Sequence, residues 1–195
     1  MRFLQHFLPG QPLEENEQTS VGLIAERSYE FDSVGFVAGT HIEYMTGALR
    51  EFQAEPTAGS AFIVATRPSG LHYDYDVDSL MAAAYYNLTK DFTERTRLIH
   101  SLRLEHLAYD YDNHHLVGNT RDDGSNCGFG GCLYTRPASR DDSFTNVGVR
   151  FGFETDFGDD VLYGAISTGF RPPQATELYR LRGGQVVADL DSEEL

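Results

Sequence analysis

Several stretches of the sequence alternate apolar and polar side chains with a period of two. In Ser33–Tyr44, the even positions are Val, Phe, Ala, Thr, Ile and Tyr, and the odd positions are mainly Gly, His and Glu. This alternation is typical of a β-strand with one apolar and one polar face. The pattern predicts an all-β protein with six strands: Thr19–Arg27, Ser33–Tyr44, Val77–Leu88, Thr96–Tyr109, Ser143–Thr155 and Val161–Phe170.

The segments that join these strands alternate between short and long. Short turns are expected near 28–32, 89–94 and 156–160, and long loops at Met45–Asp74 and Asp112–Asp142. Loops of about thirty residues are rare in compact soluble domains. Short turns at one end and long loops at the other are typical of outer-membrane barrels. The connections therefore favour an antiparallel transmembrane β-barrel segment with short periplasmic turns and long extracellular loops.

Aromatic residues lie at both ends of the expected strands. Phe31, Phe92 and Phe157 flank the short turns, and 13 or 17 residues separate them from the aromatics at the opposite ends. Those opposite aromatics are Tyr44, Tyr75, Tyr109, Phe144 and Phe170. At about 3.3 Å per residue and a tilt near 45°, 13 residues rise roughly 30 Å, which matches the hydrocarbon thickness. The two sets are then interpreted as the two interfacial girdles of a barrel, although strand ends in a soluble β-sandwich carry Tyr and Phe too.

Charge and composition exclude several classes of protein. The chain has 30 acidic and 15 basic residues and a net charge of −15, which disfavours a general nucleic-acid binder. The longest apolar stretch, Leu80–Tyr86, is far too short for a spanning helix. The start, Met1–Gly10, lacks the apolar core of a signal peptide. No nucleophile–base pair, phosphate loop or zinc signature is recognisable, so we expect no enzymatic activity and no cofactor.

The last expected strand ends in a motif that resembles a known family. Its first part is Gly169-Phe170-Arg171-Pro172-Pro173, and Glu177-Leu178-Tyr179 follow shortly after. This run resembles the strand-to-loop signature of TonB-dependent outer-membrane receptors, which show Gly-Phe-Arg-x-Pro and then Glu-Leu and an aromatic. The prolines cannot continue a ladder, so the strand must stop there. The acidic tail Asp189–Leu195 is similar to the segment that enters the next strand in such receptors.

The resemblance implies a role in energy-coupled uptake across the outer membrane of a Gram-negative bacterium. Such receptors take up an iron–siderophore complex, cobalamin or an oligosaccharide through a 22-stranded barrel that encloses a plug and is coupled to TonB. We expect residues 1–195 to be one partial barrel domain of about six strands, without plug or signal peptide and lacking the C-terminal strands. The implied partners are outer-membrane lipid, lipopolysaccharide, the protein's own plug, TonB and the transported solute, but no nucleic acid.

Some residues of the expected long loops and of the motif are candidates for solute contact. These are His114, His115, Arg121 and Arg171, and their alternative role is that of solvated loop polars. The polar face of the strands would line the barrel wall, with cross-strand ion pairs as its alternative role. That set is His41, Glu43, Arg97, Arg103, Glu105, Arg150 and Glu154.

The two cysteines lie five residues apart in the second expected long loop. Glycines between Cys127 and Cys132 permit a tight disulfide, which persists in an oxidising extracellular setting. We favour that disulfide over free thiols, and a metal site is the weakest alternative because further ligands are lacking. The acidic run Asp74–Asp78 has EF-hand-like spacing but lacks the required Gly and Glu, so no metal site is predicted.

Two other architectures share the strand pattern. One is a passive outer-membrane porin or adhesin, which gives no reason for the Phe-Arg-Pro-Pro motif. The other is a soluble β-sandwich, such as a carbohydrate-binding one, in which Phe36 and Ile42 would pack against Val149 and Phe151 in a core. In a barrel, these four side chains all point outward from one continuous sheet.

Overall fold

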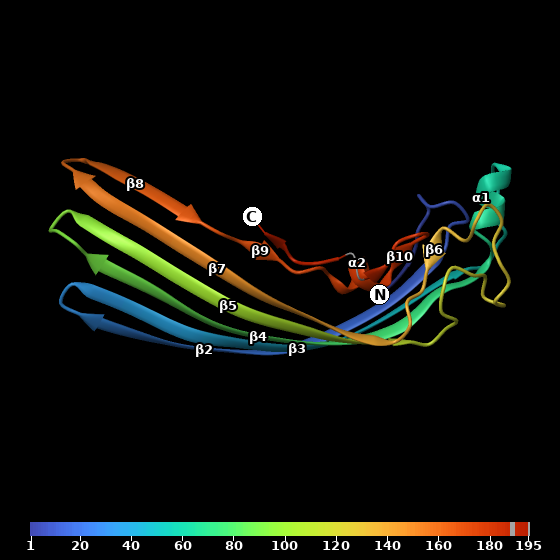
Figure 1. The fold of residues 1–195 in the computed structure, drawn as a ribbon, viewed down its shortest axis with the longest axis horizontal. Helices are drawn as coiled ribbons and strands as arrows, with labels where there is room; N and C mark the ends of the chain where they lie inside the picture. The colour runs from blue at the N-terminus through green and yellow to red at the C-terminus, as the bar shows by residue number, and fades with distance from the viewer. Residues whose placement is uncertain (188–189, 195) are drawn as a thin grey trace.

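A single curved antiparallel sheet dominates the structure, a computed structural model that describes residues 1–187 and 190–194 (Figure 1). Its strands follow the order β1-β2-β3-β4-β5-β7-β8, so each long strand pairs with its neighbour in sequence. The strands are β1 (Arg2–Leu4), β2 (Leu13–Phe31), β3 (Val34–Gln53), β4 (Gly70–Asp91), β5 (Thr96–Asn113), β7 (Arg140–Phe157) and β8 (Asp160–Ser167). The sheet is open, and the predicted fold class, a segment of an antiparallel transmembrane β-barrel, is confirmed.

All six predicted strands are present, but most are longer than their alternation indicates. β3 continues nine residues past Tyr44, and β4 begins at Gly70, so the predicted loop Met45–Asp74 is wrong at both ends. The first connection shrinks to 54–69 and contains helix α1 (Ala61–Thr66). The second predicted loop, Asp112–Asp142, shrinks to 114–139 and contains the short strand β6 (Tyr134–Thr135).

The physical reason for the extension is a change of surroundings along the strands. Past Tyr44, the convex face carries acidic residues, among them Asp74, Asp76 and Asp78, which need no apolar environment. On the concave face, side chains such as Leu49 and Tyr75 remain buried because another segment of the chain covers them. The ladder therefore continues where the simple alternation of apolar and polar residues fades.

The final predicted strand is shorter than expected, because β8 ends at Ser167 rather than Phe170. After Gly169 the chain leaves the ladder, and β9 (Phe170–Arg171) pairs with β11 (Glu193–Glu194) instead. Helix α2 (Ala175–Tyr179) and β10 (Leu181–Arg182), which pairs with β6, follow. We call residues 170–187 the covering segment, since it lies inside the curve of the sheet (Figure 1).

The two faces of the sheet have different surroundings. On the convex face, Ile42 and Phe151 are 48% and 56% exposed, and no second layer covers them within the described residues. The soluble sandwich, which requires these side chains in a dry core, is therefore excluded. The predicted wall set, from His41 to Glu154, lies on the concave face, as the cross-strand pairs Arg103–Gly148 and Arg97–Glu154 show. None of the described helices is both long and apolar enough to traverse a bilayer.

Part of the predicted acidic tail lies outside the described residues. Asp189 and Leu195 belong to that part, whereas Glu193 and Glu194 form β11.

Candidate functional site

A cavity of about 1060 Å³ lies on the concave face at the end of the sheet that bears the long connections, which we call the loop end. Two parts of the chain close it: the covering segment and the N-terminal residues around β1. The strands contribute its polar wall, and the covering segment contributes three arginines. Its polar and charged lining includes Gln5, Glu14, Glu51, Arg67, Arg171, Glu177, Arg180, Arg182 and Glu193.

A buried ionic network forms one wall of this cavity. Glu51, near the end of β3, is 1% exposed, and its carboxylate contacts Arg67 at 3.1 Å, His72 at 3.0 Å and Arg180. Arg180 also reaches Glu14 at 2.8 Å. The covering segment is thus tied to β2 and β3 through one guanidinium. We call Glu14, Glu51, Arg67, His72 and Arg180 the anchor network.

His72 is held in the anchor network by two acceptors. Its Nε2 donates to the carbonyl of Pro68 at 2.7 Å, and its Nδ1 faces the Glu51 carboxylate. Both ring nitrogens of His72 therefore face hydrogen-bond acceptors. Burial alone would raise the pKa of Glu51, but the His72 hydrogen bond and the charge of Arg180 outweigh it and lower that pKa. Glu51 is therefore ionised over the physiological range.

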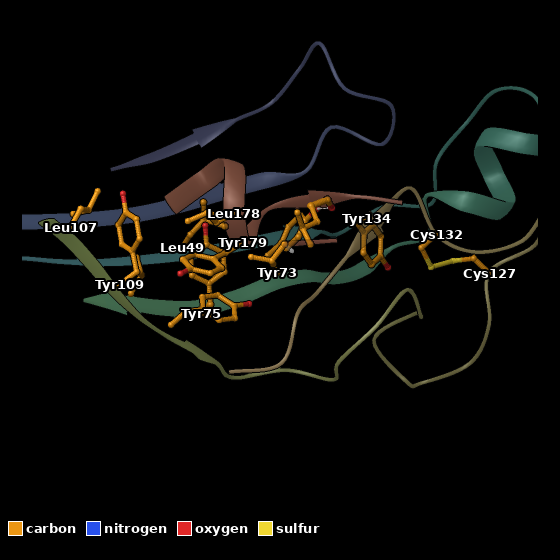
Figure 2. Packing of buried hydrophobic residues seen from close by; sticks show 14 residues of the cluster. Leu49, Tyr73, Tyr75, Leu107, Tyr109, Cys127, Cys132, Tyr134, Leu178 and Tyr179 are labelled. Carbon is orange, nitrogen blue, oxygen red and sulfur yellow. Dashed lines mark hydrogen bonds between the residues drawn. A yellow bond between two sulfur atoms is a disulfide. The ribbon is translucent and has the colours of Figure 1, made fainter. Parts of the chain in front are cut away.

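Tyrosines form the floor beneath the covering segment (Figure 2). Tyr179 of α2 stacks on Tyr111 of β5 with ring centroids 4.2 Å apart, and it meets Tyr109 and Tyr75 edge-on. Its hydroxyl donates to Asp142 at 2.9 Å. Burial raises the pKa of Tyr111 and Tyr179, so both phenols remain neutral. The cluster fixes α2 on the concave wall.

The motif residues from the sequence organise the start of the covering segment. Arg171 pairs with Glu177 at 3.0 Å and with Glu193 at 3.1 Å, and these contacts lower the pKa of both carboxyls. Glu177 also accepts a hydrogen bond from the Gln174 amide, which caps α2. The Pro173 carbonyl accepts one from Tyr109 at 3.1 Å.

The remaining motif residues explain how the segment packs. Leu178 and Tyr179 are fully buried. Phe170 lies over Gly148 of β7, where an added Cβ would come 3.4 Å from the ring. A side chain at position 148 would thus contact the Phe170 ring directly, so Phe170 packs on the wall and the motif has a structural role in this chain.

The predicted contact residues are not gathered in one place. Arg171 lines the cavity, whereas His114, His115 and Arg121 lie in the 114–139 connection and do not line it. The His114 ring lies at the convex rim, 3.5 Å from Asp76 and 3.4 Å from Asp112. Burial and the nearby Arg136 lower the pKa of His115. A role in solute contact stays a prediction for all four.

Several residues of the site were missed by sequence reasoning. Glu51, His72 and Arg180 were not singled out, because two lay in a region interpreted as loop and the third beyond the motif. Arg136 was missed too: it is 1% exposed and donates to the carbonyls of His72 and Thr120, which orders the 114–139 connection. Continuing the strand alternation past Tyr44 would have placed Glu51 on the concave face, and that was the available signal.

The structure joins Cys127 and Cys132 by a disulfide, with their Cα atoms 5.0 Å apart. We expect the folded protein to react with iodoacetamide at neither cysteine until a reductant is added, and at both afterwards, as mass spectrometry can measure. Replacing both cysteines with serine should cost at most about 2 kcal/mol of unfolding free energy, because the closed loop is short. Labelling without reductant would contradict the bond.

These features define the wall of a membrane-spanning β-barrel. Its long strands pair in sequence order, its apolar convex face is uncovered, and the covering segment lies on its concave face. The sequence matches the family model for the TonB dependent receptor-like β-barrel over residues 4–194. The chain belongs to this family, whose members are outer-membrane proteins of Gram-negative bacteria.

The fold is also similar to that of a solved transporter. The match to the copper transporter OprC has a TM-score of 0.61 and 18% sequence identity, and it covers 86% of this chain. It covers 24% of that chain, so the present sequence spans about a quarter of the structure it matches. At this identity the likeness concerns the fold alone. Comparison with curated proteins gives no match.

Proposed function

We propose that the intact protein is an outer-membrane receptor that takes up a large, scarce solute with energy supplied through TonB. The observation that carries this proposal is the cavity at the loop end of the concave face, in a chain of this family. The solute would be an iron–siderophore complex, cobalamin or an oligosaccharide. Uptake would involve binding and plug movement, with no covalent chemistry.

We propose that residues 1–195 form one part of the barrel wall around a plug supplied by the same intact protein. Seven strands cannot enclose a plugged lumen. Unpaired edges of a sheet are unfavourable when left open, so further strands would pair with β8 and with the opposite edge. The concave face would then meet the plug, and the convex face would meet outer-membrane lipid and lipopolysaccharide.

The solute would reach the cavity from the loop end. Arg171 and Arg182 line that cavity and offer charged donors to an anionic group, while the faces of nearby aromatic rings offer apolar contact. His114, His115 and Arg121 would contribute from the 114–139 connection, if that connection moves inward on binding. The anchor network would hold the wall in shape during these events.

The test uses cells that express the intact protein, with and without TonB, and a panel of radiolabelled solutes of the three classes. We expect one solute to bind in both strains and to be taken up only with TonB. Uptake that persists without TonB would instead indicate a passive channel. In the same assay, Arg182→Ala should weaken binding about tenfold, as loss of a charged hydrogen bond predicts. Arg95→Ala, in the turn at the opposite end, serves as the control.

A further inference from the structure

The convex face carries a groove at the opposite end of the sheet from the cavity. It has a volume of about 650 Å³ and crosses strands β4, β5, β7 and β8 near the short turns. Its lining side chains are apolar or aromatic except for His100 and Lys90. They are Leu88, Lys90, Leu98, His100, Phe151, Phe153 and Ile166, and Gly164 leaves space open between them.

Aromatic side chains border this groove at the depth where an interfacial girdle is expected. The His100 ring packs against Phe151 in a tilted arrangement, with ring centroids 4.3 Å apart, and shares a hydrogen bond of 3.0 Å with the Tyr86 hydroxyl. The row continues through Phe36 to Tyr29, so it spans five strands. Phe153 lies over Gly164, where an added Cβ would approach its ring to 2.7 Å. The glycine therefore maintains the groove.

Lys90 is the only lysine in the chain, and it lies on the rim of the groove. It stands opposite Val34 and Leu98 in the ladder, one residue before the strand ends at Asp91. Its neighbour Asp91 points to the concave face and pairs with Arg97 at 3.0 Å. In the described part of the chain, no ion pair or hydrogen bond engages the Lys90 ammonium, and its side chain is exposed.

We propose that this groove binds a glycerophospholipid of the leaflet next to the short turns, with its acyl chain along the apolar floor and its phosphate on Lys90. Charge complementarity supports this occupant, because the cation of Lys90 would lie at the level of the headgroups, directly beside the apolar groove. The opposite rim of the convex face carries Asp78, Asp110 and Asp141 instead. The inference rests on the membrane location proposed above and not on transport.

The experiment titrates the detergent-purified intact protein with phosphatidylglycerol and counts bound lipid by native mass spectrometry. We expect Lys90→Gln to weaken the tightest lipid site about fivefold, as one surface cation contributes at a membrane. Lys90→Arg should retain it. Arg97→Gln is the matched control, because it removes a cation at the same depth on the concave face.

Two results would overturn the proposal. One is unchanged affinity of Lys90→Gln with the protein still folded, as judged by heat-dependent gel migration. The other is equal competition by glycerol phosphate, which has the phosphate but no acyl chain and would show that the groove is not used. Either result would leave TonB-dependent uptake unaffected, so failure here is distinguishable from failure of the proposed function.

Discussion

Replacing Glu51 with glutamine should lower the free energy of unfolding by about 3–5 kcal/mol, as expected when one partner of a buried ion pair is removed. The carboxylate contacts Arg67, His72 and Arg180, and the variant removes the nearest counter-charge of both arginines. Only Glu14 remains to balance them. The measurement is denaturant unfolding of the intact protein in lipid vesicles.

The matched control is Glu15→Gln, next to the anchor network in sequence. Glu15 also meets two arginines, Arg2 at 3.1 Å and Arg50 at 3.2 Å, but these pairs are exposed and should contribute less than about 1 kcal/mol. Equal losses in the two variants would contradict the importance of burial.

Acidification should reproduce part of the Glu51→Gln effect. The folded-state pKa of Glu51 is lowered, so its stabilisation is complete above the unfolded carboxyl pKa of about 4.3. It is then lost as the pH falls through the lower folded value. The Glu51→Gln variant should therefore show a weaker acid dependence of its unfolding free energy than the parent protein.

Leu102→Arg is expected to cost about 2–4 kcal/mol, the range for a cation near the bilayer midplane on the lipid face of a barrel. Leu102 lies midway along β5 and stands opposite Tyr86 and Val149, all on the convex face. The charge would have to leave water for hydrocarbon. The same vesicle unfolding assay measures the loss.

The best control is Ser101→Lys, one residue away on the concave face. Its side chain lies at the wall beside Asn87 and is half-buried, so a long cation can extend into the lumen. Lysine at Gly148, on the same face, would be a poorer control because Phe170 lies over that position. If Leu102→Arg and Ser101→Lys were equally harmless, the assignment of faces would be wrong.

Much of the wall could be predicted because alternation reports a local property. From Val34 to Tyr44, apolar residues recur mainly at every second position. The same spacing is present in β4, β5 and β7, which pair in register with one another. The short turns and the Gly169–Tyr179 motif indicated the protein family. Together they fixed the strand order, the two faces and the place where β8 must end to within three residues.

The loop end could not be predicted in the same way because its stability is non-local. Arg180 and Glu51 are 129 residues apart in sequence, and neither position shows what it will contact. Likewise, Tyr75 and Tyr111 are buried only because Tyr179 folds back over them. In the outer half of β4 the apolar side chains Tyr73, Tyr75 and Val77 lie on the concave face, so the convex apolar stripe on which the prediction depended ends there.

The continuation of β3 to Gln53 determines how far the loop end of the sheet extends beyond the membrane. Past Tyr44 the strand has nine more residues, which rise about 20 Å at 3.3 Å per residue and a tilt near 45°. The mouth of the wall therefore stands clear of the lipid headgroups and is built from paired strands. If the intact protein takes up a solute as proposed, that solute would meet this rim of strands well before it reaches the plane of the membrane.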